Sequence, residues 1–311
     1  MTDSSHPLDD LLLRRDAVTT GWSDDELGRL VRAGELSRLR RGAYVDSVLP
    51  PAGAARHRLL IHATAAGLRR PAVVSHQSAA VLHGLPLWDV PLDRVHVTRR
   101  SRAWNDSSSV LRCHVARLGN HEVTEVDGLA VTTPVRTALD LARSLPHEAA
   151  VVALDAALNR GLLSHDLLRT RLFDLAGAPG SRSAARAVTA ADGRSASVGD
   201  SRSRVILHRW KLPPSALQFE IRSGDGGLVA RSDFAWEPER LVGEFDGRIK
   251  YGRLLRPGQE PGDAVLAEKL REAAIRDEGW GMVRWVWSDL RRPDRLAARV
   301  RRAREQSMSR R

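Results

Sequence analysis

Apolar residues at helical spacing open the chain and then give way to a short alternating stretch. Within residues 1–50 they predict three short helices followed by a β-wing over residues 39–45. Ser23 and Glu26, three residues apart, predict a capping box at the start of the second helix. The apolar positions are Leu8, Leu11 and Leu12 in the first helix and Leu27, Leu30 and Val31 in the second.

This arrangement of helices and a basic wing predicts a DNA-binding winged helix-turn-helix over residues 1–53. Arg38, Arg40 and Arg41 lie in or beside the wing, where their side chains are placed to contact phosphates. A small helical hairpin with a solvated basic edge is the alternative interpretation.

Residues 54–176 mix helical and strand patterns and predict a mixed α/β middle domain. Helices are expected at 54–68, 134–145 and 148–158, strands at 94–98 and 110–115, and a short strand followed by a helix that ends at glycine over residues 71–84. Residues 177–198 are rich in Gly, Ala, Ser and Arg, so we expect a linker there, with a weak helix at 184–191.

Residues 199–290 predict the element order α-β-β-β-α-β. The expected elements are a helix at 200–210, strands at 218–222, 228–236 and 241–246, a helix at 264–278 and a strand at 282–287. Leu266, Leu270, Ala274 and Ile275 would form the apolar side of the second helix. The fold class is therefore a multidomain protein of the α+β or α/β type.

The strands at 228–236 and 241–246 flank the turn-forming residues 237–240, which predicts a β-hairpin. Folding the hairpin about this turn pairs Trp236 with Leu241. Continuing that register places Asp233 opposite Glu244, with Asp246 on the same face as Glu244 because side chains alternate along a strand. Such a cluster of acids is tolerated when a hard cation such as Mg²⁺ or Mn²⁺ lies among them. Alternatively, one carboxylate bonds to backbone amides and the others point into water.

The sequence around this hairpin resembles the PD-(D/E)XK nuclease superfamily, and especially its Vsr-like branch. The segments that carry the resemblance are Arg231-Ser232-Asp233-Phe234, Glu244-Phe245-Asp246-Gly247, Lys250-Tyr251, Glu268-Lys269-Leu270-Arg271-Glu272, Gly279-Trp280 and Val283-Arg284. The resemblance covers about the last third of the chain and implies a restriction-endonuclease-like α/β core over residues 199–290. One departure is that the usual Glu-x-Lys of the superfamily reads Glu244-Phe245-Asp246 here.

The resemblance implies that Asp233, Glu244 and Asp246 hold Mg²⁺ or Mn²⁺ for phosphodiester hydrolysis. Asp200 matches the acidic position on the first helix of the superfamily and is a fourth expected metal ligand, although it could equally be an N-cap. Lys250 is the expected catalytic cation, with Lys269 as the second choice. The metal would lower the pKa of an attacking water and polarise the phosphate.

The charge of the chain favours a polyanionic partner. The formal net charge is +11 and the sequence pI is about 11.0, with nine arginines and two acidic residues between positions 291 and 311. We expect this segment to be an Arg-rich C-terminal helix or tail, although such a tail could also serve only solubility. The residues expected to contact DNA are Arg38, Arg40, Arg41, Arg248, Tyr251, Arg295, Arg299 and Arg302.

Residues 1 to about 176 resemble the AbiEi-type antitoxins of type IV toxin–antitoxin systems. The segments that carry this resemblance are Arg41-Gly42-Ala43-Tyr44, Ser75-His76-Gln77-Ser78 with the following Ala79-Ala80-Val81-Leu82-His83-Gly84, and Thr132-Thr133-Pro134-Val135-Arg136. The resemblance implies DNA binding, autoregulation and a cognate toxin as a further partner.

Other features narrow the range of functions. The single cysteine, Cys113, excludes an intramolecular disulfide and a Cys-based zinc site. His76 and His83 share a helical face, but no third metal ligand lies at a suitable spacing, so we expect them to pack in a core. Without a signal-peptide pattern or a long apolar segment, the expectation is a cytoplasmic protein with no membrane partner.

Two functions remain open from the sequence. The first is a metal-dependent DNA endonuclease in DNA repair or phage defence. The second is a DNA-binding transcriptional regulator or antitoxin whose nuclease-like domain is inactive. The acidic trio favours the first and the missing lysine of Glu-x-Lys favours the second.

Overall fold

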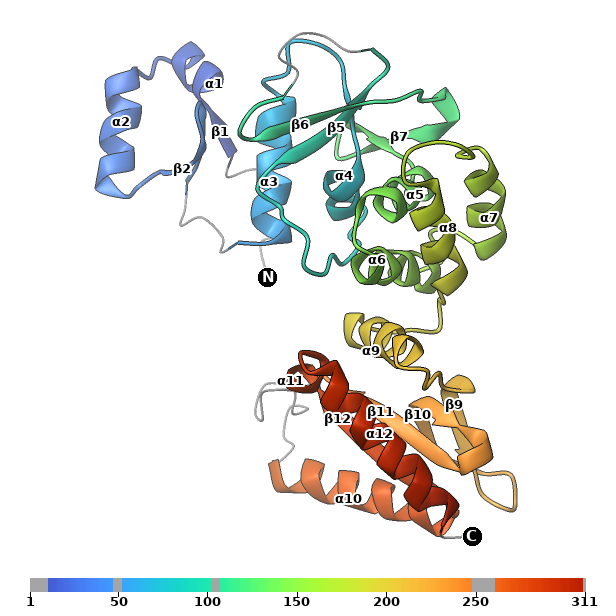
Figure 1. The fold of residues 1–311 in the computed structure, drawn as a ribbon. Coiled ribbons are helices and arrows are strands. Elements are labelled where there is room, and N and C mark those ends of the chain that lie inside the picture. The colour runs from blue at the N-terminus through green and yellow to red at the C-terminus, as the bar shows by residue number, and fades with distance from the viewer. Residues whose placement is uncertain (1–10, 47–51, 102–106, 248–260, 310–311) are drawn as a thin grey trace. The chain divides into compact units, whose positions relative to one another are not determined.

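A computed structural model describes residues 11–46, 52–101, 107–247 and 261–309 (Figure 1). The chain forms two compact units. Unit 1 contains residues 1–153 and 162–188, and unit 2 contains residues 154–161 and 189–311. The multidomain, mixed α/β class predicted from the sequence is confirmed at this level.

The first elements of unit 1 form a small helical pair beside a three-stranded sheet. The elements are β1 (Leu11–Leu13), α1 (Arg14–Thr19), α2 (Asp24–Ala33), β2 (Ser37–Arg40) and β3 (Ala43–Val45), with sheet order β1-β3-β2. The predicted capping box of α2 is confirmed, because the backbone N–H of Glu26 donates to Ser23 and the Glu26 carboxylate accepts from the Ser23 N–H. The helices and the wing pack through a small core of Ala17, Leu27 and Leu36.

The prediction of a first helix containing Leu11 and Leu12 was wrong. Leu11–Leu13 is a strand that pairs with β3, where Leu11 lies opposite Val45. Three consecutive leucines can bury their side chains on both faces of a strand between the helical pair and the rest of unit 1, which helical spacing would not allow. Leu8 lies outside the described residues.

The rest of unit 1 is a five-stranded sheet with helices packed against it (Figure 1). Its strands, in sheet order, are β6 (Leu111–Val115), β5 (Val95–Arg99), β4 (Val73–Val74), β8 (Leu129–Thr132) and β7 (Val123–Val126). The helices are α3 (Ala54–Ala65), α4 (His76–Leu82), η1 (Asn120–Glu122), α5 (Pro134–Ser144), α6 (His147–Asn159), α7 (His165–Phe173) and α8 (Ser181–Ala190). The hairpin of β7 and β8 was not predicted, whereas α8 falls within the expected linker.

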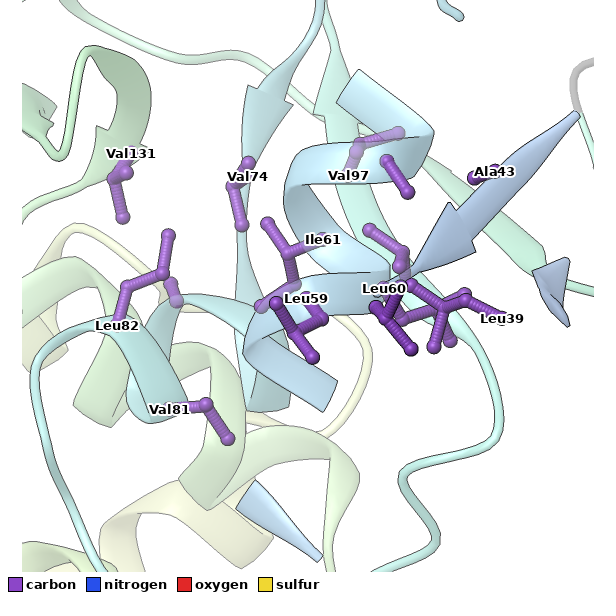
Figure 2. Close-up of a cluster of buried hydrophobic side chains, with 14 residues drawn as sticks. Leu39, Ala43, Leu59, Leu60, Ile61, Val74, Val81, Leu82, Val97 and Val131 are labelled. Carbon is purple, nitrogen blue, oxygen red and sulfur yellow. The ribbon is translucent and has the colours of Figure 1, made fainter. Parts of the chain in front are cut away.

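The wing and the middle region share one hydrophobic core (Figure 2). Leu39 and Ala43 of the wing pack with Leu60 and Ile61 of α3, and Val97 of β5 belongs to the same cluster. The predicted DNA-binding segment is therefore held in place by the core of the middle region rather than by its own small core alone.

Unit 2 has the predicted element order. Its elements are α9 (Val198–Arg209), β9 (Ala216–Arg222), β10 (Leu228–Trp236), η2 (Glu237–Glu239), β11 (Leu241–Asp246), α10 (Pro261–Asp277), β12 (Gly281–Val286), α11 (Trp287–Leu290) and α12 (Pro293–Met308). The sheet order is β12-β11-β10-β9, with β12 parallel to β11 and the other pairs antiparallel.

The strands of unit 2 carry apolar side chains on both faces. On one face Phe234 and Trp236 pack with residues of α9 and α12, and on the other Ala235 and Val242 pack with Ile275 of α10. The predicted hairpin register is confirmed for Trp236 with Leu241, Ala235 with Val242 and Phe234 with Gly243.

The helix α10 differs from its prediction in the residues that it buries, whereas α12 forms where a C-terminal helix was expected. Leu266 and Leu270 were expected on the buried side of α10, but their side chains are 57% and 62% exposed, so that prediction was wrong. The sheet-facing side of α10 instead includes the buried Ile275 and the half-buried Arg271, because this helix faces charged partners on the sheet. The Arg-rich C-terminal segment is the helix α12, and its Leu296 and Val300 are part of the core.

The start of unit 2 is tied to the end of α6 by a buried ion pair. Arg204 of α9 donates to Asp155 over 2.6 Å, and both side chains are almost fully buried. The second carboxylate oxygen of Asp155 accepts the backbone N–H of Asp192 at 2.7 Å. Burial raises the pKa of Asp155, while Arg204 acts in the opposite direction. This pairing places the last residues of α6 with unit 2.

Two glycine substitutions should have opposite effects on stability. A Cβ at Gly199 in α9 would overlap the ring of Phe245, so Gly199→Ala is expected to cost roughly 1–3 kcal/mol. A Cβ at Gly28 in α2 meets only the flexible end of Arg32 at 3.4 Å, so Gly28→Ala is expected to stabilise by roughly 0.5–1 kcal/mol. Urea unfolding followed by circular dichroism measures both changes, and a Gly199→Ala variant as stable as the wild type would contradict the packing of α9 on β11.

Candidate nucleic-acid interface and acidic hairpin

The wing presents two arginines to solvent. Arg38 points outward from β2 because its neighbour Leu39 is buried in the core, and Arg41 lies at the turn before β3. Neither side chain has an ion-pair or hydrogen-bond partner among the described residues. Unpaired exposed guanidinium groups on a wing can contact phosphates of a duplex without first breaking an internal bond.

Arg40, the third predicted wing contact, is placed differently. Its guanidinium donates to the carbonyl of Ala63 in α3 and, over 3.1 Å, to the carbonyl of Arg41. Burial lowers the pKa of Arg40. Arg40 thus fastens the wing to α3, and the outward cations of the wing are Arg38 and Arg41.

The second helix, α2, carries two basic residues that the sequence analysis did not single out. Arg29 and Arg32 lie three residues apart and are both exposed. In a helix-turn-helix the second helix enters the major groove. The i, i+3 spacing of Arg29 and Arg32 on one exposed face could therefore have identified them as candidate DNA contacts from the sequence. The acidic start of α2 is partly neutralised, because Arg14 makes two hydrogen bonds to Asp24 at 2.5 and 2.6 Å.

The predicted DNA contacts in unit 2 divide into three groups. Arg295 and Arg302 are exposed on α12 and have no partner among the described residues. Arg299 instead pairs with Asp289 at 2.8 Å, which fastens α12 to α11. Arg248, Lys250 and Tyr251 lie outside the described residues, and their roles stay predictions.

Asp233 lies near the middle of β10, with both carboxylate oxygens engaged. One accepts the backbone N–H of Phe245 at 2.9 Å, and the other lies 3.4 Å from the side-chain amide of Gln218. Burial raises the pKa of Asp233, the Phe245 N–H lowers it, and the charge of Glu244 raises it further. The net effect is a carboxyl group that is more easily protonated than usual.

Glu244 on β11 is occupied by two arginines. Arg271 of α10 donates to its oxygens at 2.5 and 2.6 Å, and Arg284 of β12 donates to it at 3.2 Å. Ser232 adds a hydrogen bond at 3.2 Å, and the Glu244 side chain is only 13% exposed. Burial lowers the pKa of Arg271, but Glu244 and then Glu268 raise it by more. The sequence analysis quoted Arg271 and Arg284 only as part of a resemblance and did not recognise them as partners of Glu244.

Asp200 lies in the first turn of α9 and is buried. The N-cap is Ser197, whose side chain accepts the Asp200 N–H at 3.1 Å, so Asp200 itself is not the cap. Burial and then the charge of Asp233 raise the pKa of Asp200 to about 6. Asp246, by contrast, is exposed at the end of β11.

The donor set of the hairpin does not fit a divalent ion in this arrangement. Glu244 is turned toward Arg271 and Arg284, and Asp233 accepts from a backbone amide. Over the described part of unit 2, no three acidic side chains bring their oxygens within mutual reach of one ion. The metal-binding roles of Asp200, Asp233, Glu244 and Asp246 stay predictions.

No helix in the described part of the chain is long and apolar enough to cross a membrane.

Two protein families match segments of this chain. Residues 9–45 match the family described as "Transcriptional regulator, AbiEi antitoxin", and residues 71–190 match the family described as "AbiEi antitoxin C-terminal domain". The AbiEi resemblance predicted from the sequence is confirmed for these two segments, which supply a helix-turn-helix-type N-terminal domain and the antitoxin C-terminal domain. The nuclease resemblance of residues 199–290 stays a prediction.

Two curated proteins of Mycobacterium tuberculosis, from strains CDC 1551 / Oshkosh and ATCC 25618 / H37Rv, are similar to this chain and are both described as uncharacterized. Each is 35% identical over 179 residues, which is 57% of this chain and 62% of the relative. The match thus spans less than two thirds of the length of either relative.

The raised pKa of Asp200 predicts that Asp200 destabilises the folded state of unit 2 increasingly as pH rises. The folded state binds this proton up to about pH 6 and the unfolded state only up to about pH 4, so the contribution of Asp200 to stability falls as pH rises between these values. Asp200→Asn is therefore expected to be increasingly more stable than the wild type from pH 4 to pH 7. Urea unfolding across this range tests this, with the exposed Asp277→Asn as the control, and a wild-type advantage at pH 7 would contradict it.

Proposed function

We propose that this chain is a DNA-binding transcriptional regulator that acts as the antitoxin of a toxin–antitoxin pair. The observation that carries the proposal is the pair of unpartnered wing arginines, Arg38 and Arg41, on a segment that matches AbiEi antitoxin regulators. A regulator needs a rigid DNA-contacting surface, and the core shared by the wing and α3 supplies the rigidity.

DNA binding by this surface would be mainly electrostatic. The net charge of +11 favours association with a polyanion, and α2 offers Arg29 and Arg32 to the major groove while the wing offers Arg38 and Arg41 to the backbone. The antitoxin C-terminal domain match over residues 71–190 supports a cognate toxin as the second partner.

Unit 2 would then act without hydrolysing DNA. Its largely buried hairpin acid Glu244 is neutralised by Arg271 and Arg284, an arrangement that stabilises the sheet and occupies the carboxylate that a metal ion would need. Arg295 and Arg302 on α12 remain available for backbone contacts. A nuclease-like fold would in this way serve as a DNA-binding or partner-binding module.

A metal-dependent DNA endonuclease, with Mg²⁺ or Mn²⁺, is the second candidate function. The observation that favours it is that the charge of the half-buried Asp233 raises the pKa of the buried Asp200, because an added cation would relieve that repulsion. The endonuclease requires Glu244 to exchange its arginines for a metal ion.

Arg38→Ala and Arg41→Ala should each weaken binding to the DNA of the protein's own promoter. Each lost phosphate contact is expected to reduce the slope of log affinity against log salt by about 1, at any duplex sequence. Fluorescence anisotropy at several salt concentrations measures the slope. Arg169→Ala is the matched control, because it removes an exposed arginine of α7 that has no partner within the described ranges of the chain. An unchanged slope in both wing variants, or no repression of a promoter reporter by the wild type, would contradict the regulator proposal.

A DNA-cleavage assay separates the regulator proposal from the endonuclease candidate. Labelled single-stranded, duplex and mismatched DNA would be incubated with Mg²⁺ or Mn²⁺ and the wild type, Asp233→Ala or Glu244→Ala. We expect no cleavage by any of the three proteins, because Glu244 is held by two arginines. Cleavage by the wild type that both substitutions abolish would establish the nuclease and overturn the proposal for unit 2.

A further inference from the structure

Three histidines from separate elements of unit 1 meet at one point. His76 begins α4, His96 lies on β5 and His114 lies on β6. One ring nitrogen from each lies within 4.8 Å of the others. They are the only group of three or more metal-ligating side chains found this close together over the described part of the chain. Neither DNA binding nor the acidic hairpin uses them.

The sheet topology brings these residues together. β5 and β6 are parallel, with His96 opposite Arg112 and Thr98 opposite His114, so both histidines project from the same face of the sheet. His76 follows β4, which pairs with β5 on its other side, and it adopts a positive φ of 52°. A non-glycine residue in the left-handed region costs of order 1 kcal/mol, so the packing around His76 must stabilise this conformation.

The rings already face one another. His96 Nδ1 lies 2.9 Å from His114 Nε2, and the His76 ring stacks on the His114 ring at a centroid separation of 3.7 Å. Burial is the main reason that the pKa values of His76, His96 and His114 fall to about 2, 3 and 4. All three imidazoles are therefore neutral at neutral pH, which is the form that binds metals.

One hydroxyl group behind the cluster contacts the His76 ring, and a second one holds the backbone of His96. Ser75 Oγ lies 3.0 Å from His76 Nδ1 and accepts a hydrogen bond from Thr98 over 2.8 Å. The other ring nitrogen of His76, Nε2, has no hydrogen bond to any residue that the structure describes. Ser78 Oγ accepts the backbone N–H of His96 at 2.8 Å. The contact between Ser75 and the His76 ring is of the kind that fixes ring orientation at metal sites.

The surrounding charges permit a cation. Arg136 and Arg143 approach the cluster, but both pair with Asp140, at 3.0 and 3.6 Å, so their field on the histidines is partly cancelled. Arg112 is exposed and its charge is screened by solvent. Asp93 also acts on His96, and its negative charge favours a cation there.

We propose that His76, His96 and His114 bind one transition-metal ion of the Zn²⁺ class. Three imidazole nitrogens suit Zn²⁺, Co²⁺, Ni²⁺ or Cu²⁺ and disfavour Mg²⁺ or Ca²⁺, which take oxygen ligands. The three side chains leave a fourth position for water or an external ligand. Binding would require the rings to rotate until each nitrogen lies about 2.0–2.1 Å from one shared ion. The ion would join α4 to β5 and β6.

The test uses tag-free, full-length protein. Isothermal titration with ZnCl₂ is expected to give one saturable site per chain, and His96→Gln and His114→Gln should weaken it by more than the roughly 10–100-fold typical of losing a supporting hydrogen bond. The exposed His121→Gln, in the same unit, is the matched control and should bind like the wild type.

A second measurement covers variants that fail to fold. The Co²⁺-loaded wild type should show the intense visible absorption of a four-coordinate ion, and Zn²⁺ should displace it. Zn²⁺ should also raise the melting temperature of the wild type, because a ligand that binds only the folded state stabilises it. The proposal is overturned if the wild type has no stoichiometric site, or if folded His96→Gln and His114→Gln variants bind Zn²⁺ as tightly as the wild type.

Discussion

The charge of Glu244 is the constraint on which the arrangement of unit 2 depends. A carboxylate that is only 13% exposed in a sheet needs a cation close by, and this chain supplies two, Arg271 and Arg284. Arg271 must face the sheet to reach it, which sets the rotation of α10. The same rotation turns Leu266 and Leu270 outward and lets Glu268 and Glu272 join the network around Arg284. The electrostatic requirement of one residue thus overrides the apolar pattern of a whole helix.

A similar trade between charge and packing shapes the wing. Arg40 gives up its availability to DNA to bond the carbonyl of Ala63, while Leu39 and Ala43 enter the core that α3 shares with β5. The wing is consequently a rigid extension of the middle region, and Arg38 and Arg41 are held at fixed positions on its outer side. In the proposed role, a DNA-contacting surface built in this way would lose little conformational entropy on binding.

Sequence patterns correctly predicted the features that depend on interactions between residues close together in the chain. The capping box of α2, the register of the β10–β11 hairpin and the element order of unit 2 follow from short-range spacing, turn residues and apolar alternation. Leu11–Leu13 was mistaken for a helix because three adjacent leucines have no clear period, and pairing with β3 decided the outcome. The pairing of Glu244 with Arg271 and Arg284, 27 and 40 residues away, depends on how elements pack and has no signal in local spacing.

The histidine cluster is a second example of a long-range arrangement that local sequence spacing does not reveal. Considered along the sequence, His76 and His83 share a helical face, yet His83 contacts the carbonyl of Thr132 and the partners of His76 come from β5 and β6. Their separations of 20 and 18 residues match no metal-binding spacing, because the distances are set by a parallel strand pair and a strand-to-helix turn. The acids of the hairpin instead bind different partners within the protein. Glu244 forms ion pairs with arginines, and Asp233 accepts a hydrogen bond from a backbone amide. Whether polar groups form a site is therefore decided by what else the fold gives them to bind, and in this chain the fold satisfies the hairpin acids and leaves the histidines facing one another.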